Sequence, residues 1–349
     1  MPTNTAAWLR ATGAPLDIAP APYPSPSGNE IVIQTAAIAI NPVDWAIQAR
    51  GDAYFPWVHF PAVLGSDVAG TVTAVGSDVT RFRPGDRVVG HALGITAAAP
   101  RNAAFQTFVV LHEHMASRIP AALAFERAAV LPLALSTAAA GLFLKDYLAL
   151  AYPTVPPRAP VGETLLVWGG STSVGCNAIQ LAVAAGYEVF TTASPHNWEL
   201  MKKLGASAVW DYRSETVVEE LVEALRGKKC AGAIASASAF VPGAGPPNAA
   251  PACVEIVARS EGKKFVALAM RPPEGLGEQV ESKFIVSYDL KDNEASKVVY
   301  EDFLPRALED GAYIAAPDPE VVGKGLESLQ TAFDIQKKGV SAKKVVVTL

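Results

Sequence analysis

The chain has 349 residues, more than one hydrophobic core usually serves, so two domains are expected. Half of the residues are hydrophobic, 18% are charged, and no apolar run approaches the roughly 20 residues that span a bilayer, which favours a soluble globular protein over a membrane protein. The net charge of −5, with no block of Lys or Arg, argues against a nucleic-acid-binding protein and favours a small-molecule partner.

The three cysteines, Cys176, Cys230 and Cys253, are scattered along the chain. An odd, scattered set argues against a disulfide framework and against a Cys-rich zinc site. Residues 1–8 show neither a basic segment followed by an apolar core nor an Arg-rich amphipathic stretch. We therefore expect a cytoplasmic protein.

Residues 1–125 contain short β-rich stretches separated by Gly and Pro, at 30–35, 67–76 and 86–89. This pattern predicts a partly open β-barrel. From about residue 126 to 288 the pattern changes to strand and helix in alternation, which predicts a doubly wound α/β domain with a parallel sheet. The expected strands are 165–168, 188–192, 208–210, 233–235 and 265–268, with helices at 173–185 and 197–204.

Several other segments have local signals. The Pro-rich segments 152–160 and 242–251 are expected to be loops. Residues 284–288 are expected to form an apolar edge strand that could pair across a homodimer. Residues 289–349 are assigned to a C-terminal return to the first domain, with a helix at 321–338 and a strand at 344–347.

The densest chemical signal is a glycine-rich turn between an apolar strand and a helix. Gly169 and Gly170 begin the turn, and Gly175 lies in the helix that follows. Such a turn lets backbone N–H groups approach a pyrophosphate, and the helix N-terminus adds a positive dipole. Thr172 replaces the middle glycine of the G-x-G-x-x-G pattern, so a turn that binds no nucleotide stays an alternative. The candidate cofactor-binding residues are Gly170, Ser171, Thr172, Ser173, Val174 and Gly175.

The end of the second strand of this domain indicates the choice of cofactor. An NAD site usually has Asp or Glu there to hold the ribose 2′-hydroxyl, whereas residues 191–197 contain hydroxyl, imidazole and amide side chains and no carboxylate. NADPH is therefore the expected cofactor, with Ser194, Asn197 and Tyr212 as candidate phosphate contacts. Ser194 could instead serve only as the N-cap of a helical turn.

Three motifs resemble the medium-chain dehydrogenase/reductase superfamily: residues 64–70, the segment 84–88, and the turn from Gly169 to Gly175. Residues 41–45, 194–197 and 205–213 further resemble fungal enoyl reductases, which include stand-alone partners of polyketide synthases. The resemblance covers nearly the whole chain. It implies a GroES-like first domain (1–125) and a Rossmann NADP-binding domain (126–288).

Zinc-dependent members of the superfamily have a Cys ligand in the segment that matches 41–44 and a His-Glu pair where this chain has Ser66 and Asp67. Neither ligand type is present here, and the Cys-rich lobe expected after Gly90 is replaced by small residues at 94–104. Tetrahedral N/S ligation is therefore not available, and we expect neither catalytic nor structural zinc.

The resemblance also implies a substrate site and a proton donor. Tyr54 stands at the distance from residues 41–44 where related enoyl reductases place a proton-donating tyrosine, although a half-buried loop tyrosine is an equal alternative. Residues 42–45 (Pro42, Val43, Asp44, Trp45) would lie at the nicotinamide end, with Asp44 also a candidate helix cap. Residues 131–138 would lie at the domain junction and contact the substrate through Leu133, Leu135, Ser136 and Thr137, although the apolar character of this segment equally describes the start of a buried helix.

The sequence thus predicts an NADPH-dependent reductase that transfers hydride to an enoyl thioester, an enone or a quinone without zinc. Its substrate could be an acyl chain presented by a polyketide synthase. Two alternatives stay open: a protein of the same fold that binds NADPH without turnover, and a zinc alcohol dehydrogenase.

Overall fold

The computed structural model of the chain describes residues 2–97, 99–236, 249–273, 275–276 and 279–349. It divides into two compact units. Unit 1 comprises Met1–Leu133, Tyr300–Gly311 and Asp318–Leu349, and unit 2 comprises Ala134–Val299 and Ala312–Pro317. The assignment of 1–125, 126–288 and 289–349 to three functional parts stays a prediction. None of the helices in the described ranges is long and apolar enough to cross a membrane.

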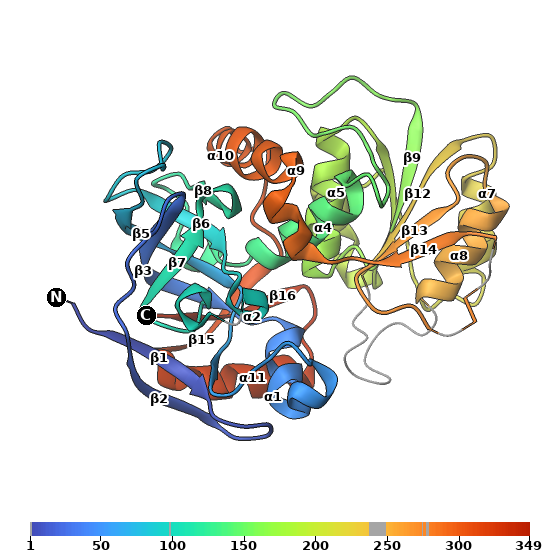
Figure 1. Cartoon of the computed structure of the whole chain (residues 1–349). Helices are drawn as coiled ribbons and strands as arrows, with labels where there is room; N and C mark the ends of the chain where they lie inside the picture. Colours follow the sequence, from blue (N-terminus) through green and yellow to red (C-terminus); the bar gives the residue numbers. More distant parts are fainter. Residues whose placement is uncertain (1, 98, 237–248, 274, 277–278) are drawn as a thin grey trace. The chain divides into compact units, whose positions relative to one another are not determined.

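Unit 1 is built on two β-sheets (Figure 1). The larger has the order β15-β16-β3-β5-β6-β8, and β7 also pairs with β3. Its strands are β3 (Glu30–Ala39), β5 (Asp67–Val75), β6 (Arg87–His91), β7 (Phe108–His112), β8 (Ala116–Arg118), β15 (Asp318–Lys324) and β16 (Lys343–Thr348). The smaller has the order β2-β1-β4, from Leu16–Ala21, Asn4–Leu9 and Ala62–Val63. The predicted β-rich first domain is confirmed.

The C-terminal segment completes the larger sheet. β16 pairs antiparallel with β3 and parallel with β15, so the strand expected at 344–347 is present and lies beside β3. The predicted helix at 321–338 is wrong in its first part. Residues 318–324 form the edge strand β15, where Val321 is 50% exposed, and the helix α11 begins only at Leu329 (Leu329–Lys338). Pairing with β16 decides this segment, and helical periodicity does not reveal such a long-range partner.

The helices of unit 1 are α1 (Pro42–Tyr54), α2 (Gly94–Ala97), α3 (Phe125–Ala128), α10 (Leu304–Glu309) and α11. α1 is kinked at Gly51, which has a φ of 56° and a ψ of −154°. A Cβ at this position would lie 1.8 Å from the hydroxyl oxygen of Thr12. Glycine therefore sets the direction of the last turn of α1, which ends in Tyr54.

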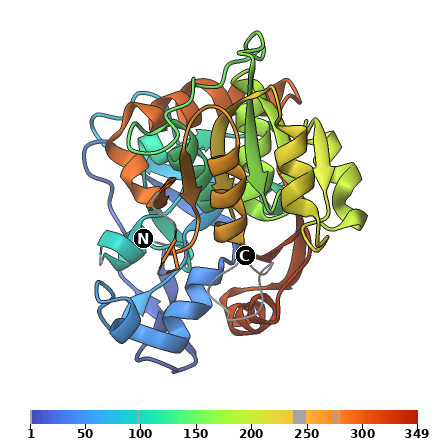
Figure 2. The ribbon, with the colours of Figure 1, turned by 90° about the vertical axis from the view of Figure 1, so that its right-hand side faces the viewer.

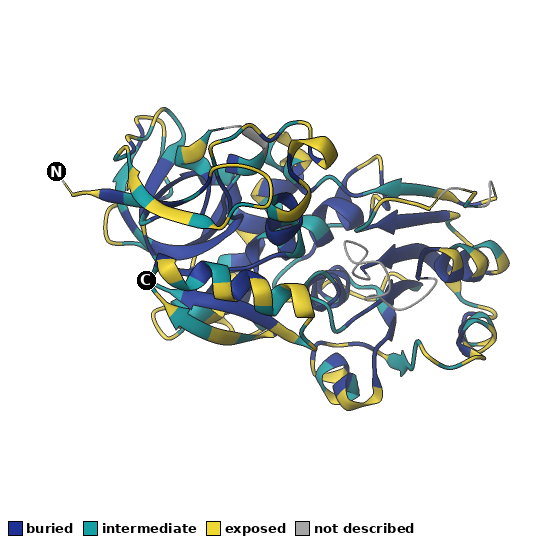
Figure 3. Cartoon of the chain, turned by 90° about the horizontal axis from the view of Figure 1, so that it is seen from below, coloured by how far each residue is buried: buried dark blue, intermediate teal, exposed yellow. Residues whose placement is uncertain are grey.

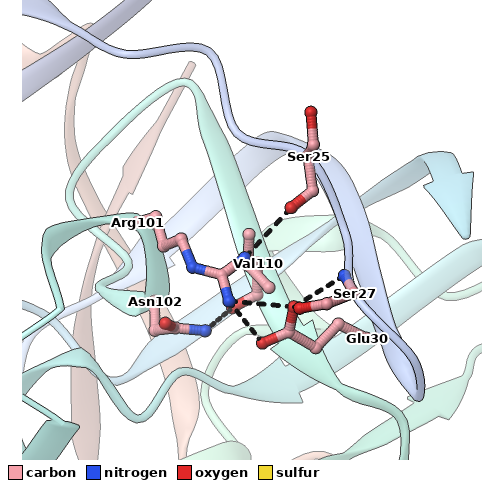
Figure 4. A network of polar contacts seen from close by, with 6 residues as sticks. All are labelled: Ser25, Ser27, Glu30, Arg101, Asn102 and Val110. Atoms are coloured by element: carbon pink, nitrogen blue, oxygen red, sulfur yellow. Dashed lines mark hydrogen bonds and ion pairs between the residues drawn. The ribbon is translucent and has the colours of Figure 1, made fainter. Parts of the chain in front are cut away.

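A polar network fixes the start of β3 in unit 1 (Figure 4). Arg101 donates from Nη2 to both carboxylate oxygens of Glu30, at 2.8 and 3.0 Å, and the Ser27 hydroxyl donates to Oε2 at 2.6 Å. Burial would raise the pKa of Glu30, but the hydrogen bonds from Ser27 and Arg101 lower it below its ordinary value. Glu30 therefore stays ionised at the rim of the sheet.

Unit 2 contains a six-stranded parallel sheet of order β11-β10-β9-β12-β13-β14. The predicted doubly wound architecture is confirmed. The strands are β9 (Glu163–Trp168), β10 (Glu188–Thr192), β11 (Ala208–Trp210), β12 (Lys229–Ala235), β13 (Phe265–Leu268) and β14 (Glu281–Phe284). The helices are α4 (Pro132–Phe143), which begins at the end of unit 1, α5 (Ser173–Ala184), α6 (Trp198–Lys203), α7 (Val217–Ala224), α8 (Ala249–Arg259) and α9 (Glu294–Ser296).

The helices of unit 2 cover both faces of its sheet. α7 and α8 pack on one face, seen from the front in Figure 2, and α5 lies on the other (Figure 1). Leu166 and Trp168 of β9 belong to the cluster under α7 and α8. Side chains alternate along a strand, so Leu165 and Val167 face the opposite side of the sheet. All four are buried, and Figure 3 shows the central strands of the two larger sheets as mostly buried.

Two local predictions in unit 2 need correction. Within the expected loop 242–251, residues 249–251 form the first turn of α8, where Pro251 is tolerated because first-turn amides have no helical partner; residues 242–248 lie outside the described part. The expected edge strand at 284–288 is shifted, because β14 ends at Phe284 and a 3₁₀ segment begins at Ser287. β14 is nevertheless an edge strand of the sheet.

Candidate functional site

The glycine turn of unit 2 links β9 to α5 with little free space. Gly169 has a φ of 84°, which favours glycine. A Cβ on Gly170 would lie 2.2 Å from the hydroxyl oxygen of Thr191, and a Cβ on Gly175 would lie 2.3 Å from the carbonyl oxygen of Gly169. Glycine is therefore required at 170 and 175 for α5 to begin this close to the sheet.

Thr172 is the N-cap of α5. Its hydroxyl oxygen accepts from the Gly175 amide at 3.0 Å and donates to the Gly169 carbonyl at 2.8 Å. The hydroxyl of Ser236, which follows β12, lies 2.8 Å away. The side chain that replaces the middle glycine thus makes hydrogen bonds to the backbone of the turn itself. Ser171, Ser173 and Val174 are half-buried beside it, so the first turn of α5 offers backbone N–H groups of the kind that bind a pyrophosphate.

The end of β10 brings two of the three predicted phosphate contacts together. The hydroxyl of Ser194 donates to the Tyr212 hydroxyl at 3.2 Å, and Ser194 and Asn197 are each 8% exposed. Ser194 stands at the N-cap of the 3₁₀ turn 195–197, but its side chain makes no capping bond. The carboxylate of Asp211 is bound to Arg213 at 2.9 Å, and the hydrogen bond from Arg213 lowers the pKa of Asp211.

In unit 1, residues 42–45 form the start of α1. Pro42 and Val43 are half-buried, while Asp44 and Trp45 are buried. Asp44 Oδ2 accepts from the backbone amide of Asn41 at 2.8 Å. Asp44 therefore caps α1, as one of the sequence-based alternatives expected.

A buried network of charged and polar groups lies beside this helix start. Asp67 Oδ2 accepts from Lys344 Nζ at 2.9 Å and from Asn41 Nδ2 at 2.8 Å, and Lys344 also donates to Asn41 Oδ1 at 2.5 Å. Asp67 and Asp44 are fully buried, and Asn41 and Lys344 are at most 4% exposed. Sequence reasoning missed this network; a lysine inside an otherwise apolar strand was the signal that could have indicated it.

The network contains two carboxyl groups and one ammonium group. Burial raises the pKa of Asp44 to about 7; Asp67 acts in the same direction, and the Asn41 amide and Lys344 oppose it. The imidazole of His91, opposite Asp67 in the β5–β6 pairing, has a pKa lowered to about 4 by burial, against an opposing effect of Asp67. His91 therefore adds no positive charge near neutral pH.

The predicted substrate residues differ in burial and belong to two units. Leu133, at the end of the first section of unit 1, is half-buried, and its amide donates to Asp67 Oδ1 at 2.6 Å. Leu135 and Ser136 in unit 2 are fully buried, and Thr137 is half-buried.

Unit 1 also has a cavity of about 30 Å³, which has room for one or two water molecules. It is lined by Trp57, Val58, His59, Pro61, Ala62, Val63, Leu64, Gly94, Ile95, Ala99 and Pro100.

Tyr54 lies at the end of α1, beyond the kink, and is 39% exposed. The guanidinium of Arg50 lies 4.9 Å from the centre of its ring, and the ring of Phe55 lies 4.9 Å away in an edge-on arrangement. Tyr54 is thus accessible to a reactant. Its role as proton donor stays a prediction.

Within the described ranges, no group of three or more His, Cys, Asp and Glu side chains is arranged to hold a metal ion. Ser66 and Asp67, which match the position of a His-Glu ligand pair in zinc-dependent relatives, are buried. Asp67 is bound to Lys344. The three cysteines are buried, and burial raises the pKa of each thiol.

Comparison with known proteins agrees with this architecture. The family model for the alcohol dehydrogenase GroES-like domain matches residues 27–121. The chain is 54% identical to the dehydrogenase azaJ of Aspergillus niger, with both chains covered completely. It is 38% identical to the trans-enoyl reductase himH of Aspergillus japonicus, over 99% of this chain and 97% of the relative.

The chain belongs to the medium-chain dehydrogenase/reductase superfamily. It is an oxidoreductase of this superfamily with a GroES-like domain and a Rossmann-like parallel sheet. Two solved structures share its fold. A quinone oxidoreductase of Pseudomonas syringae has a TM-score of 0.72 at 22% identity, covering 99% of this chain and 100% of that chain. A mycobacterial protein solved with NADPH has a TM-score of 0.69 at 24% identity, with the same coverage.

Proposed function

We propose that this medium-chain dehydrogenase/reductase is an NADPH-dependent, zinc-independent reductase of activated C=C bonds. The observation that carries the proposal is the glycine turn at the N-terminus of α5, combined with the absence of any carboxylate at residues 191–197. Gly170, Thr172 and Gly175 would let the backbone meet the pyrophosphate. Ser194, Asn197 and Tyr212 would meet the 2′-phosphate with neutral polar groups.

The bound nicotinamide would supply a hydride, and the protein residues orient the reactants. Residues 41–44 and 66–67 carry none of the Cys and His ligand types that hold catalytic zinc. Reduction of a simple carbonyl would therefore have no metal Lewis acid. A conjugated substrate needs less assistance, because its own π-system spreads the incoming charge to an oxygen.

We propose an enoyl thioester or an enone as the substrate, with a quinone as a further acceptor of the same electronic type. The similarity to an Aspergillus trans-enoyl reductase supports the first class, and the similarity to a solved quinone oxidoreductase fold supports the further acceptor. The acyl chain could be presented by a polyketide synthase. In this scheme Leu133, Leu135, Ser136 and Thr137 contact the substrate, and Tyr54 protonates the enolate that hydride addition leaves.

The test is NADPH oxidation by purified protein in the presence of an enoyl thioester, an enone or a quinone, with metal analysis of the same sample. We expect turnover with at least one of these acceptors and well under one equivalent of zinc. NADPH binding without oxidation by any acceptor would support a non-catalytic binding protein. Stoichiometric zinc that is lost together with activity on chelation would support a zinc dehydrogenase.

A further inference from the structure

The peptide group between Pro132 and Leu133 is held at both of its polar atoms. The Tyr300 hydroxyl donates to the Pro132 carbonyl at 3.0 Å, and the Leu133 amide donates to Asp67 Oδ1 at 2.6 Å. Tyr300 and Asp67 are fully buried and come from the π-helical segment Lys297–Phe303 and from β5. All four residues belong to unit 1.

Asp67 is itself fixed by charge. Its other oxygen accepts from Lys344 and Asn41, so three donors converge on one buried carboxylate. The amide of Leu133 also lies in the first turn of α4, where helical N–H groups have no internal partner and a negative charge is favoured. The Oδ2 atom of Asp44 accepts from the Asn41 amide, and its Oδ1 meets no donor at full hydrogen-bond geometry. The ammonium of Lys344 thus forms its ion pair with Asp67, and its charge acts on Asp44 without a direct ion pair.

We propose that Asp67, Lys344 and Tyr300 are positioning residues for the reductase: together they clamp the Pro132–Leu133 peptide, and so hold Leu133 for contact with the substrate. This inference rests on the proposed function, because Leu133 is a substrate contact only in that scheme. The three residues touch no reactant. They act through the backbone at Leu133. Its position matters because a small displacement of a bound reactant can slow a reaction strongly.

Two conservative variants test the clamp. Asp67 accepts a hydrogen bond from each of its three partners. In Asp67→Asn, the new NH₂ group is a donor and must therefore face at least one of these donors. Tyr300→Phe removes only the hydroxyl. For each variant we expect the KM for the carbon substrate to rise roughly tenfold while the Kd for NADPH changes less than about twofold. Lys344→Arg keeps the positive charge, so its KM should rise less above the wild-type value than the KM of Lys344→Met.

A second measurement needs no turnover. In Asp67→Asn, hydrogen exchange at the Leu133 amide should become at least about tenfold faster, whereas Asp44→Asn should leave the protection of that amide unchanged. Arg127→Met is the control for loss of an ion pair in unit 1. Arg127 forms an exposed pair with Asp318, with 2.8 Å between Nη1 and Oδ1, and this pair includes no residue of the clamp. This variant should change neither the exchange of Leu133 nor the KM.

The outcomes separate the two proposals. Faster Leu133 exchange in Asp67→Asn without turnover by any wild-type sample would support the clamp and contradict the reductase. Wild-type turnover with unchanged KM in both Asp67→Asn and Tyr300→Phe would overturn the positioning role. The positioning role would also be overturned if kcat fell, KM rose and NADPH affinity fell together, in proportion to a loss of global stability. If Asp44→Asn exposes the Leu133 amide and Asp67→Asn does not, the charge assignment is wrong.

Discussion

The glycine turn of unit 2 and the charged network of unit 1 are both tightly packed, but they are built by opposite means. The turn depends on backbone atoms and the absence of side chains: Gly170 and Gly175 leave the space that α5 needs. The network depends on buried side-chain charge, with Lys344 between Asp67 and Asn41. An added side-chain atom should therefore disturb the glycine turn, whereas a change in protonation should disturb the charged network. The four predictions below use this difference, from the largest expected effect to the smallest.

The largest effect is expected in the pH dependence of stability in Asp44→Asn. The pKa of Asp44 is about 7 in the folded protein, against an ordinary value of 3.8. Between these values the folded protein holds a proton on Asp44 that the unfolded chain has released. The contribution of Asp44 to stability therefore falls as pH rises, by about 1.4 kcal/mol per pH unit, and levels off above about pH 7.

Asp44→Asn lacks this titration. The difference between the unfolding free energies of variant and wild type should therefore shift in favour of the variant by roughly 3 kcal/mol from pH 4 to pH 7. Urea unfolding at intervals over this range measures the difference. Parallel curves would mean that Asp44 is charged throughout and that the network has a net negative charge.

The next effect is expected at the glycine turn. In Gly175→Ala the new Cβ would lie 2.3 Å from the Gly169 carbonyl, so α5 or the turn must shift. NADPH affinity, measured by fluorescence titration, should fall at least about 100-fold, or 2.7 kcal/mol. Gly162→Ala is the control for backbone strain alone, because its φ is 77° but a Cβ there meets no atom within 4 Å; the NADPH affinity of the folded variant should be unchanged. Unaltered binding by Gly175→Ala would place the cofactor elsewhere.

A similar or smaller loss is expected for Tyr54→Phe. If the phenol protonates the enolate, kcat with an enoyl or enone substrate should fall by roughly 100-fold, while NADPH affinity barely changes. A quinone is the internal control, because its reduced oxygens can take protons from solvent. Wild-type rates with both substrates would identify Tyr54 as a packing residue beside Arg50 and Phe55.

The smallest effect is the cofactor preference. NADPH should bind at least about tenfold more tightly than NADH, which corresponds to 1.4 kcal/mol. Asn197→Asp should narrow the preference by charge repulsion, and the neutral Asn197→Ser should narrow it less. Equal affinities in the wild type would contradict the role of the missing carboxylate at residues 191–197.

The sequence by itself determined the parts of this protein that depend on neighbours along the chain. The strand, turn and helix around Gly169 to Gly175 follow from local conformational freedom and periodicity, and the alternation from residue 126 predicts the parallel sheet. The helix cap by Asp44 could also be expected, because the capped amide is only three residues away.

Only the tertiary structure decided which distant residues meet. Residues 318–324 are a strand because they pair with β16. The clamp joins residues that are far apart in sequence: Asp67 lies 66 positions from Leu133, and Tyr300 lies 168 positions from Pro132. Lys344 is buried 303 positions from Asn41 in sequence. A charge can be buried only where opposite charge and donors converge on it, and no local pattern records that convergence.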